Sequence, residues 1–280
     1  MHRRLWLLRL GLALALVFAL APSPVLAQRD PITGFFNMIF GQPRRAPEAP
    51  AAPIEAPKKA KPAEPKIVEQ PKNPDAQTVL VLGDIEAAGL GVGLQMAFAE
   101  EPALAVLTRT KAAAGLARDG EQDWLTAGTR FLVEHPADFL VVMIGINDWQ
   151  PIAQAGAKPL EPGSEEWMRR YAERLDRWIT ALKATGKPFW WVGLPPTADA
   201  DLGPTRRAAF AAFLSSLNDL ARPRVEAAGG TFVDIWAAFT DEEGHYTQMG
   251  PDITGQVKRL RMNDGILFTR AGQRKLAFFV

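Results

Sequence analysis

Five short runs of mainly β-branched, aromatic and leucine residues constrain the fold of this chain most, because each is followed by a helical pattern or a polar loop. Continuously apolar strands are typical of a sheet that is buried on both faces. The alternation predicts an α/β domain with a doubly wound, mostly parallel five-stranded sheet in a flavodoxin-like three-layer arrangement. The functional crevice of such a sheet lies at the carboxyl ends of its strands. The expected strands are Thr78–Gly83, Leu104–Thr108, Phe139–Ile144, Phe189–Gly193 and Thr231–Asp234.

Two long helices and a small hairpin are expected between and after these strands. Ser164 and the two glutamates that follow it are typical of a helix start, and they predict a helix that runs to Ala184. A second helix is expected from Thr205 to Ala228. The segment Tyr246–Met262 has the pattern of a two-stranded excursion that walls one side of the crevice. Its basic side chains are interpreted as a solvated face: Lys258, Arg259 and Arg261.

The N-terminal quarter of the chain indicates export rather than part of the fold. Residues 1–27 begin with basic side chains, continue with an apolar run too short to span a bilayer comfortably, and end in small residues. They predict a cleaved signal peptide and a periplasmic or otherwise exported protein, with an uncleaved membrane anchor as the alternative. Residues 28–42 form a short apolar segment, and residues 43–76 form a Pro/Ala/Lys-rich linker. The folded domain is expected at residues 77–280.

The short apolar segment is too small to make a core of its own. Its residues 31–42 include three phenylalanines, a methionine and two isoleucines. Packing on its own domain, contact with a membrane surface near the N-terminus, and contact with a protein partner all remain open for it.

Charge and composition exclude several classes of function. The 32 Lys and Arg residues nearly balance 31 Asp and Glu residues, and no basic patch is interleaved with aromatic residues, so nucleic-acid binding is not expected. The chain has no cysteine, which excludes disulfides, thiolate metal sites and a cysteine nucleophile. No cofactor is expected.

Three polar motifs stand where catalytic loops of such a sheet belong. Gly83-Asp84-Ile85 ends the first strand, Gly145-Ile146-Asn147-Asp148 ends the third, and Asp264-Gly265-Ile266-Leu267 lies near the C-terminus. This layout resembles the SGNH (GDSL-like) hydrolases, over about 200 residues. That family has Gly-Asp-Ser after strand one, a glycine in a second block, Gly-x-Asn-Asp after strand three, and Asp-x-x-His near its end. The chain looks closest to an uncharacterised periplasmic branch of it.

The two ends of the family's catalytic triad are replaced. Ile85 occupies the position of the nucleophilic serine, and Leu267 occupies that of the histidine base. Isoleucine has no lone pair for attack on a carbonyl and leucine accepts no proton, so the acyl-enzyme route is closed. The remnant Asp264 has no base to orient.

The resemblance leaves the binding half of the site in place. It implies that the Gly115 backbone N–H and the Asn147 amide bind a carbonyl oxygen, as in the family's oxyanion hole. Capping of the following turn is the alternative for Asn147 and Asp148. For Asp84 we expect mainly a structural tie to neighbouring loop amides, with Gly145 as a supporting residue. Trp149 either stacks on a ligand or packs under the loop.

We expect no other residue to take over the missing roles. His245, the alternative base, lies in a segment expected to form an exposed turn that is distant in sequence from Asp264. The aspartates Asp84, Asp148 and Asp264 match no metal motif, so no metal site is expected.

Three functional hypotheses follow. The leading one is a degenerate hydrolase, or pseudoenzyme, that binds a cell-envelope ligand such as an acylated glycan or peptidoglycan, or a protein partner. The second is a working envelope esterase or acyl transferase with a non-standard site. The third is a tethered structural adaptor.

Overall fold

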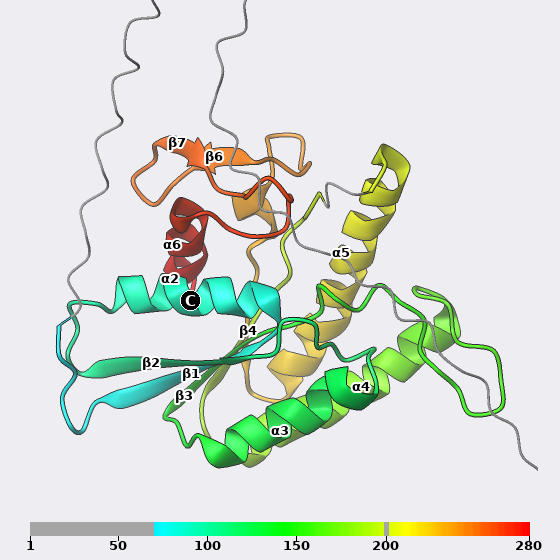
Figure 1. Ribbon diagram of the computed structural model, residues 1–280, viewed down its shortest axis with the longest axis horizontal. Coiled ribbons are helices and arrows are strands. Elements are labelled where there is room, and N and C mark those ends of the chain that lie inside the picture. The colour runs from blue at the N-terminus through cyan, green and yellow to red at the C-terminus, as the bar shows by residue number, and fades with distance from the viewer. Residues whose placement is uncertain (1–69, 199–201) are drawn as a thin grey trace, which may run out of the picture. The chain divides into compact units, whose positions relative to one another are not determined.

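The computed structural model describes residues 70–198 and 202–280, which form an α/β domain around one parallel sheet (Figure 1). The predicted signal peptide, the apolar segment and the linker up to residue 69 lie outside the described residues. The sheet order is β2-β1-β3-β4-β5, and every neighbouring pair is parallel. The predicted five-stranded, flavodoxin-like fold is therefore confirmed. The strands are β1 (Gln77–Gly83), β2 (Leu104–Thr110), β3 (Phe139–Met143), β4 (Phe189–Val192) and β5 (Thr231–Val233).

Helices cover both faces of this sheet. The two long predicted helices are confirmed to within a residue at each end, and Ser164 caps the first through its hydroxyl group. The two-stranded excursion is also confirmed, as the antiparallel hairpin β6 (Met249–Pro251) and β7 (Val257–Arg259). Short 3-10 turns lie at Gly120–Gln122 and Trp236–Phe239. The helices are α2 (Ile85–Ala97), α3 (Trp124–Glu134), α4 (Glu165–Ala184), α5 (Pro204–Ala227) and α6 (Arg270–Phe278).

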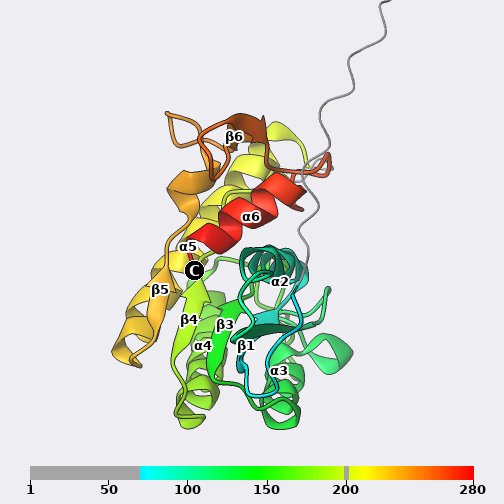
Figure 2. The same ribbon diagram turned by 90° about the vertical axis from the view of Figure 1, so that its left-hand side faces the viewer.

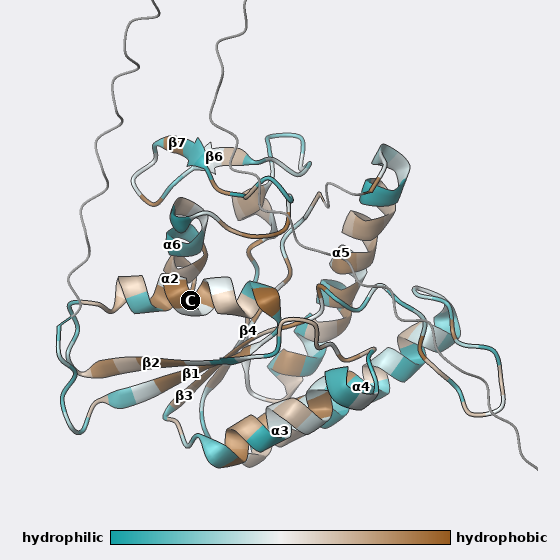
Figure 3. Ribbon diagram, in the orientation of Figure 1, coloured by the Kyte–Doolittle hydropathy of each residue, from teal (hydrophilic) through white to brown (hydrophobic). Residues whose placement is uncertain are grey.

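Alternate residues of the strands point into two separate apolar cores. On one face, Leu80 and Leu82 pack with the buried sides of α3, α4 and α5. On the other face, Val79 and Val81 pack with α2 and α6. Figure 2 shows α2 and α6 on one side of the sheet and α3 and α4 on the other. Figure 3 shows hydrophobic residues along the strands between these layers.

Glycines let α2 approach its neighbours closely. A Cβ atom on Gly91 would lie 2.2 Å from the Thr108 hydroxyl oxygen, and one on Gly93 would lie 2.1 Å from the Gln273 carbonyl oxygen. The glycines of this helix therefore serve close packing against β2 and α6. No helix within residues 70–198 and 202–280 combines the length and the hydropathy that a membrane crossing needs.

Candidate functional site

Asp84 joins the carboxyl ends of β1 and β3. It follows β1 directly and caps α2, so its carboxylate accepts hydrogen bonds from the backbone N–H groups of Glu86 at 3.0 Å, Gly145 at 2.8 Å and Ile146 at 3.2 Å. The side chain is fully buried, and burial raises its pKa well above the ordinary value. Asp84 thus ties the start of α2 to the backbone of the loop after β3.

Asp148 holds a second loop in the same way. Its carboxylate accepts hydrogen bonds from the N–H groups of Leu116 at 3.1 Å and Ala117 at 2.8 Å, and from the Tyr171 hydroxyl at 2.9 Å. Burial is the main cause that raises the pKa of Asp148 to about 6. A Cβ atom on Gly115 would lie 2.0 Å from Asp148 Oδ1, so only glycine fits beside this carboxylate. The predicted glycine therefore has a packing role at this position.

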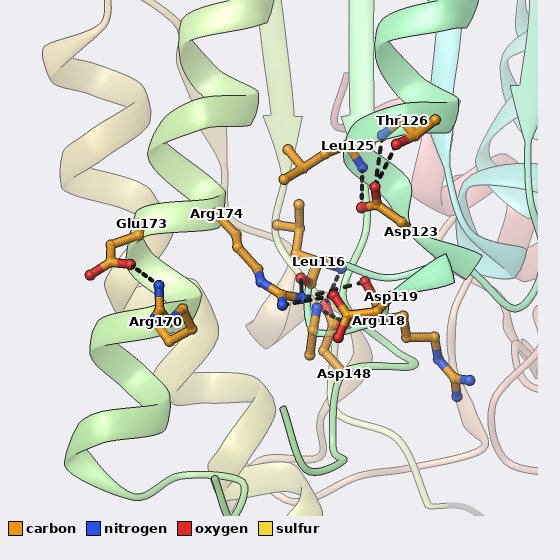
Figure 4. A network of polar contacts seen from close by, with 11 residues as sticks. Leu116, Arg118, Asp119, Asp123, Leu125, Thr126, Asp148, Arg170, Glu173 and Arg174 are labelled. Atoms are coloured by element: carbon orange, nitrogen blue, oxygen red, sulfur yellow. Dashed lines mark hydrogen bonds and ion pairs between the residues drawn. The ribbon is translucent and has the colours of Figure 1, made fainter. Parts of the chain in front are cut away.

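Arg174 of α4 holds the other side of that loop (Figure 4). Its guanidinium donates to the carbonyl oxygens of Leu116 at 2.9 Å and Arg118 at 3.3 Å, and it pairs with Asp119 at 2.8 Å. The turn is thus bound through its N–H groups by Asp148 and through its carbonyl groups by Arg174. No feature of the sequence around Arg174 indicated this role.

The two groups expected to bind a carbonyl oxygen already have partners. The Asn147 amide nitrogen donates to the carbonyl oxygens of Ala112 at 2.8 Å and Ala114 at 2.9 Å, which uses both of its N–H bonds. The Gly115 N–H donates to the Gln122 carbonyl oxygen at 3.2 Å. In this geometry both groups stabilise the loop, and binding of a ligand oxygen by them requires exchange of a partner. Their role as an oxyanion hole stays a prediction.

Asp264 makes the third loop contact. Its Oδ1 atom accepts hydrogen bonds from the N–H groups of Ile266 at 2.8 Å and Leu267 at 2.9 Å. Leu267 and Ile85 are half-buried, and Ile85 and Ile266 pack against the larger core. The positions that the resemblance assigns to nucleophile and base therefore present hydrocarbon side chains on hydrogen-bonded loops.

Arg261 is buried, contrary to the expectation from the sequence. It was interpreted as part of a solvated face, but it is completely buried and pairs with the equally buried Glu86 at 3.2 Å. Its guanidinium also donates to the carbonyl oxygens of Pro196 and Ile266, and it lies 3.8 Å from the centre of the Phe268 ring. The interpretation was wrong because the Arg261 side chain meets Glu86 at the start of α2 instead of facing water.

Glu86 is the second residue that the sequence interpretation missed. Burial raises its pKa to about 7, although the charge of Arg261 acts in the opposite direction. A signal for it exists in the sequence, since Glu86 is the only charged residue in the stretch Ile85–Gly93 that begins α2. Charged residues on the apolar side of a helix are rarely buried without a partner.

Trp149 packs on aromatic neighbours, and His245 lies near an aspartate of its own turn. The Trp149 ring stacks on Phe210 with 5.0 Å between ring centres and 15° between planes, and the guanidinium of Arg206 lies 5.5 Å from its ring. Trp149 therefore packs under the loop, with part of its surface exposed. The His245 side chain is 79% exposed, and its Nδ1 atom lies 3.8 Å from Asp241 Oδ1. Within the described residues no acidic or histidine cluster is arranged to hold a metal ion.

Comparison with known proteins agrees with this architecture. A candidate acylhydrolase from Bacteroides fragilis superposes with a TM-score of 0.52 at 14% identity, covering 75% of this chain and 87% of that one. A carbohydrate acetylesterase family member from Sinorhizobium meliloti has a TM-score of 0.49 at 16% identity, with coverages of 72% and 94%. An aryl esterase of M. smegmatis has a TM-score of 0.48 at 16% identity, with coverages of 72% and 95%. No curated protein matches the sequence.

The family relationship follows from the sequence. The model of the family described as "Protein of unknown function (DUF459)" matches residues 78–280, which include every strand-end loop discussed above. The chain belongs to the DUF459 family.

Proposed function

We propose that this chain is an exported SGNH-fold protein that binds an acylated glycan of the cell envelope, such as acetylated peptidoglycan, without hydrolysing it. The observation that carries the proposal is the pair of aliphatic side chains, Ile85 and Leu267, on otherwise intact strand-end loops. Neither side chain attacks a carbonyl or carries a proton. Loss of the triad from a serine hydrolase lowers turnover by roughly six orders of magnitude.

The ligand class is inferred from the surface that these loops offer. Ile85, Ile266 and Leu267 are half-buried aliphatic residues, and hydrocarbon of this kind suits an acyl group better than a charged substrate. The exposed part of Trp149 suits contact with a sugar ring. Export of the protein is part of the same proposal and is supported by the composition of residues 1–27.

Hydrolysis of a short-chain aryl acetate tests the catalytic half of the proposal. We expect the full-length protein to match the buffer background, because nucleophile and base are absent. The double variant Ile85→Ser/Leu267→His is expected to gain measurable turnover. A matched triple variant that adds Asp264→Asn should lose most of that gain, since the amide orients an imidazole less well than a carboxylate does. Turnover by the parent that disappears in Asp84→Asn or Asp264→Asn would show a working enzyme instead.

Binding is tested separately with purified, acetylated peptidoglycan sacculi. We expect the full-length protein to sediment with them, and Ile85→Asp, which puts a charge among the aliphatic residues, to remain in solution. Chemically deacetylated sacculi provide the matched ligand control. Equal sedimentation with both preparations would argue against recognition of the acyl group, and a protein crosslinked by the parent but not by the variant would favour the adaptor hypothesis.

A further inference from the structure

An apolar cavity of about 310 Å³ lies on the α2 and α6 side of the sheet, at the amino ends of the strands. Its floor is formed by Val79 of β1, Val141 of β3 and Leu94 of α2, all of which are buried. Gln77 is the one polar residue among those that line it. The cavity lies at the opposite strand ends from the loops of Asp84, Asp148 and Asp264, so it is separate from the candidate site described above.

The cavity exists because this face of the sheet has less helix cover than the other. Three helices pack on the larger core, whereas the smaller core has α2 and the nine-residue α6. Val280, two residues after the end of α6, lies at the edge of the cavity. The amino-terminal parts of β3 and β4 are therefore left with half-buried aromatic residues, Phe139 and Trp190, whose ring centres are 6.1 Å apart.

The rim of the cavity consists of apolar side chains, and one ammonium group, from a residue outside the lining, bonds the backbone next to it. Phe98 and Leu104 are half-buried rim residues. The Lys72 ammonium lies beside Phe98, where it donates to the carbonyl oxygens of Phe98 at 2.6 Å and Glu101 at 3.1 Å. An ammonium group has three N–H bonds, so one remains for a further acceptor. The cavity thus offers a hydrocarbon interior with a cationic donor near its rim.

We propose that this cavity binds the alkyl chain of a long-chain carboxylate, with the carboxylate group at Lys72. Ligand cavities of this size are lined mainly by apolar residues and carry few polar groups that fix orientation. An alkyl chain matches the uncharged lining, and the carboxylate complements the remaining N–H of the ammonium group. The proposal is independent of hydrolysis or glycan binding at the strand-end loops.

Calorimetric titration of the full-length protein with dodecanoate, below the concentration at which it forms micelles, tests the proposal. We expect saturable binding, and at least tenfold weaker binding by Leu104→Trp, whose indole occupies the space at the rim. The matched control is Leu132→Trp, which makes the same change in a different cavity, next to His135 and Pro136. Absence of saturable binding, or equal weakening by both variants, would overturn the proposal.

Two further measurements locate the chain and its head group. Terminally brominated dodecanoate is expected to quench tryptophan fluorescence in the parent and much less in Trp190→Phe, because bromine quenches only rings that it contacts. Dodecanol is expected to bind at least tenfold more weakly than dodecanoate to the parent, and Lys72→Gln should remove that difference. Undiminished quenching in Trp190→Phe would place the ligand elsewhere, and equal binding of alcohol and carboxylate by the parent would refute the role of Lys72.

Discussion

Three aspartates shape the strand-end loops by the same means. Asp84, Asp148 and Asp264 each accept hydrogen bonds from two or more backbone N–H groups. Buried N–H groups without partners are costly, so each carboxylate stabilises a backbone path that has few alternatives. Two of these carboxylates are completely buried, which disfavours their charged forms.

Asp148 should make the stability of the domain depend on pH. Its pKa is raised from 3.8 to about 6 in the folded protein, so between these values the folded state binds more protons than the unfolded state does. Its contribution is therefore fully present below pH 3.8 and is lost as the pH rises through about 6. The full span corresponds to about 3 kcal/mol.

Urea unfolding of the parent and of Asp148→Asn, at several pH values from acid to neutral, measures this contribution. Asp84 and Glu86 change stability in the same direction, so the parent profile falls with rising pH for several reasons. We expect the free energy of unfolding of Asp148→Asn to fall less with rising pH than that of the parent, because the variant lacks the contribution of Asp148. The exposed substitution Asp241→Asn serves as the control with the parental slope. Parallel profiles of parent and Asp148→Asn would contradict the raised pKa.

The sequence allowed contacts between neighbouring strand-end loops to be predicted, but not the contact between α2 and the C-terminal loop. Asp84 was expected to bind loop amides because it follows an apolar strand directly, where acceptors of this kind stabilise turns. Glu86 and Arg261 are 175 residues apart, and neither position carries a local pattern that predicts the other. Only the packing of the C-terminal loop on α2 brings them together.

The strands and the two long helices could be predicted because their signals are local. Each strand is an apolar run that one sheet buries, and α4 has a capping serine with acidic residues in its first turn. The short helix α6 has a capping threonine, Thr269, but no acidic residue in its first turn, and only four of its nine residues are buried. Its position depends on α2, which it contacts through glycine.

We expect Gly93 to be required for the close packing of α2 against α6. A Cβ atom there would lie 2.1 Å from the backbone oxygen of Gln273 and 3.0 Å from the Cβ atom of Ala277, so Gly93→Ala forces the two helices apart. Overpacking of this kind costs about 1–3 kcal/mol. Thermal or urea unfolding of the variant, compared with the parent, measures the loss.

Gly89→Ala is the matched control on the same helix. Its new Cβ atom would lie 3.4 Å from the Phe268 ring, which is ordinary contact. Because alanine favours a helix over glycine by about 1 kcal/mol, this variant should be as stable as the parent or slightly more stable. Equal destabilisation by both substitutions would show that the distance between α2 and α6 does not limit stability.

The two faces of the sheet differ in the amount of structure that covers them. The larger core includes the buried sides of three helices, with Trp124, Trp167 and Trp178 fully buried. The smaller core depends on α2, on α6 and on the loops around the hairpin, and Phe278 at the end of α6 is 71% exposed. Unequal burial predicts unequal resistance to local opening.

Hydrogen exchange on the native protein should reveal this difference. We expect the amides of α6 and of the β6–β7 hairpin to exchange through local openings, and those of β1, β3 and α4 to exchange only through opening of the whole domain. Increasing low concentrations of urea should accelerate exchange in the second group but scarcely in the first. A single common dependence on urea across all these elements would show that the domain opens as one unit.

The contacts of Asp264 have a consequence for how such a protein changes over generations. Its carboxylate bonds the main chain at Ile266 and Leu267, so the path of that loop does not depend on which side chain stands at position 267. Asp84 holds the start of α2 through the N–H of Glu86, independently of the side chain at position 85. The main chain of both loops is thus held without help from the side chains at positions 85 and 267, so substitution there changes what the loops present more than the path that they follow.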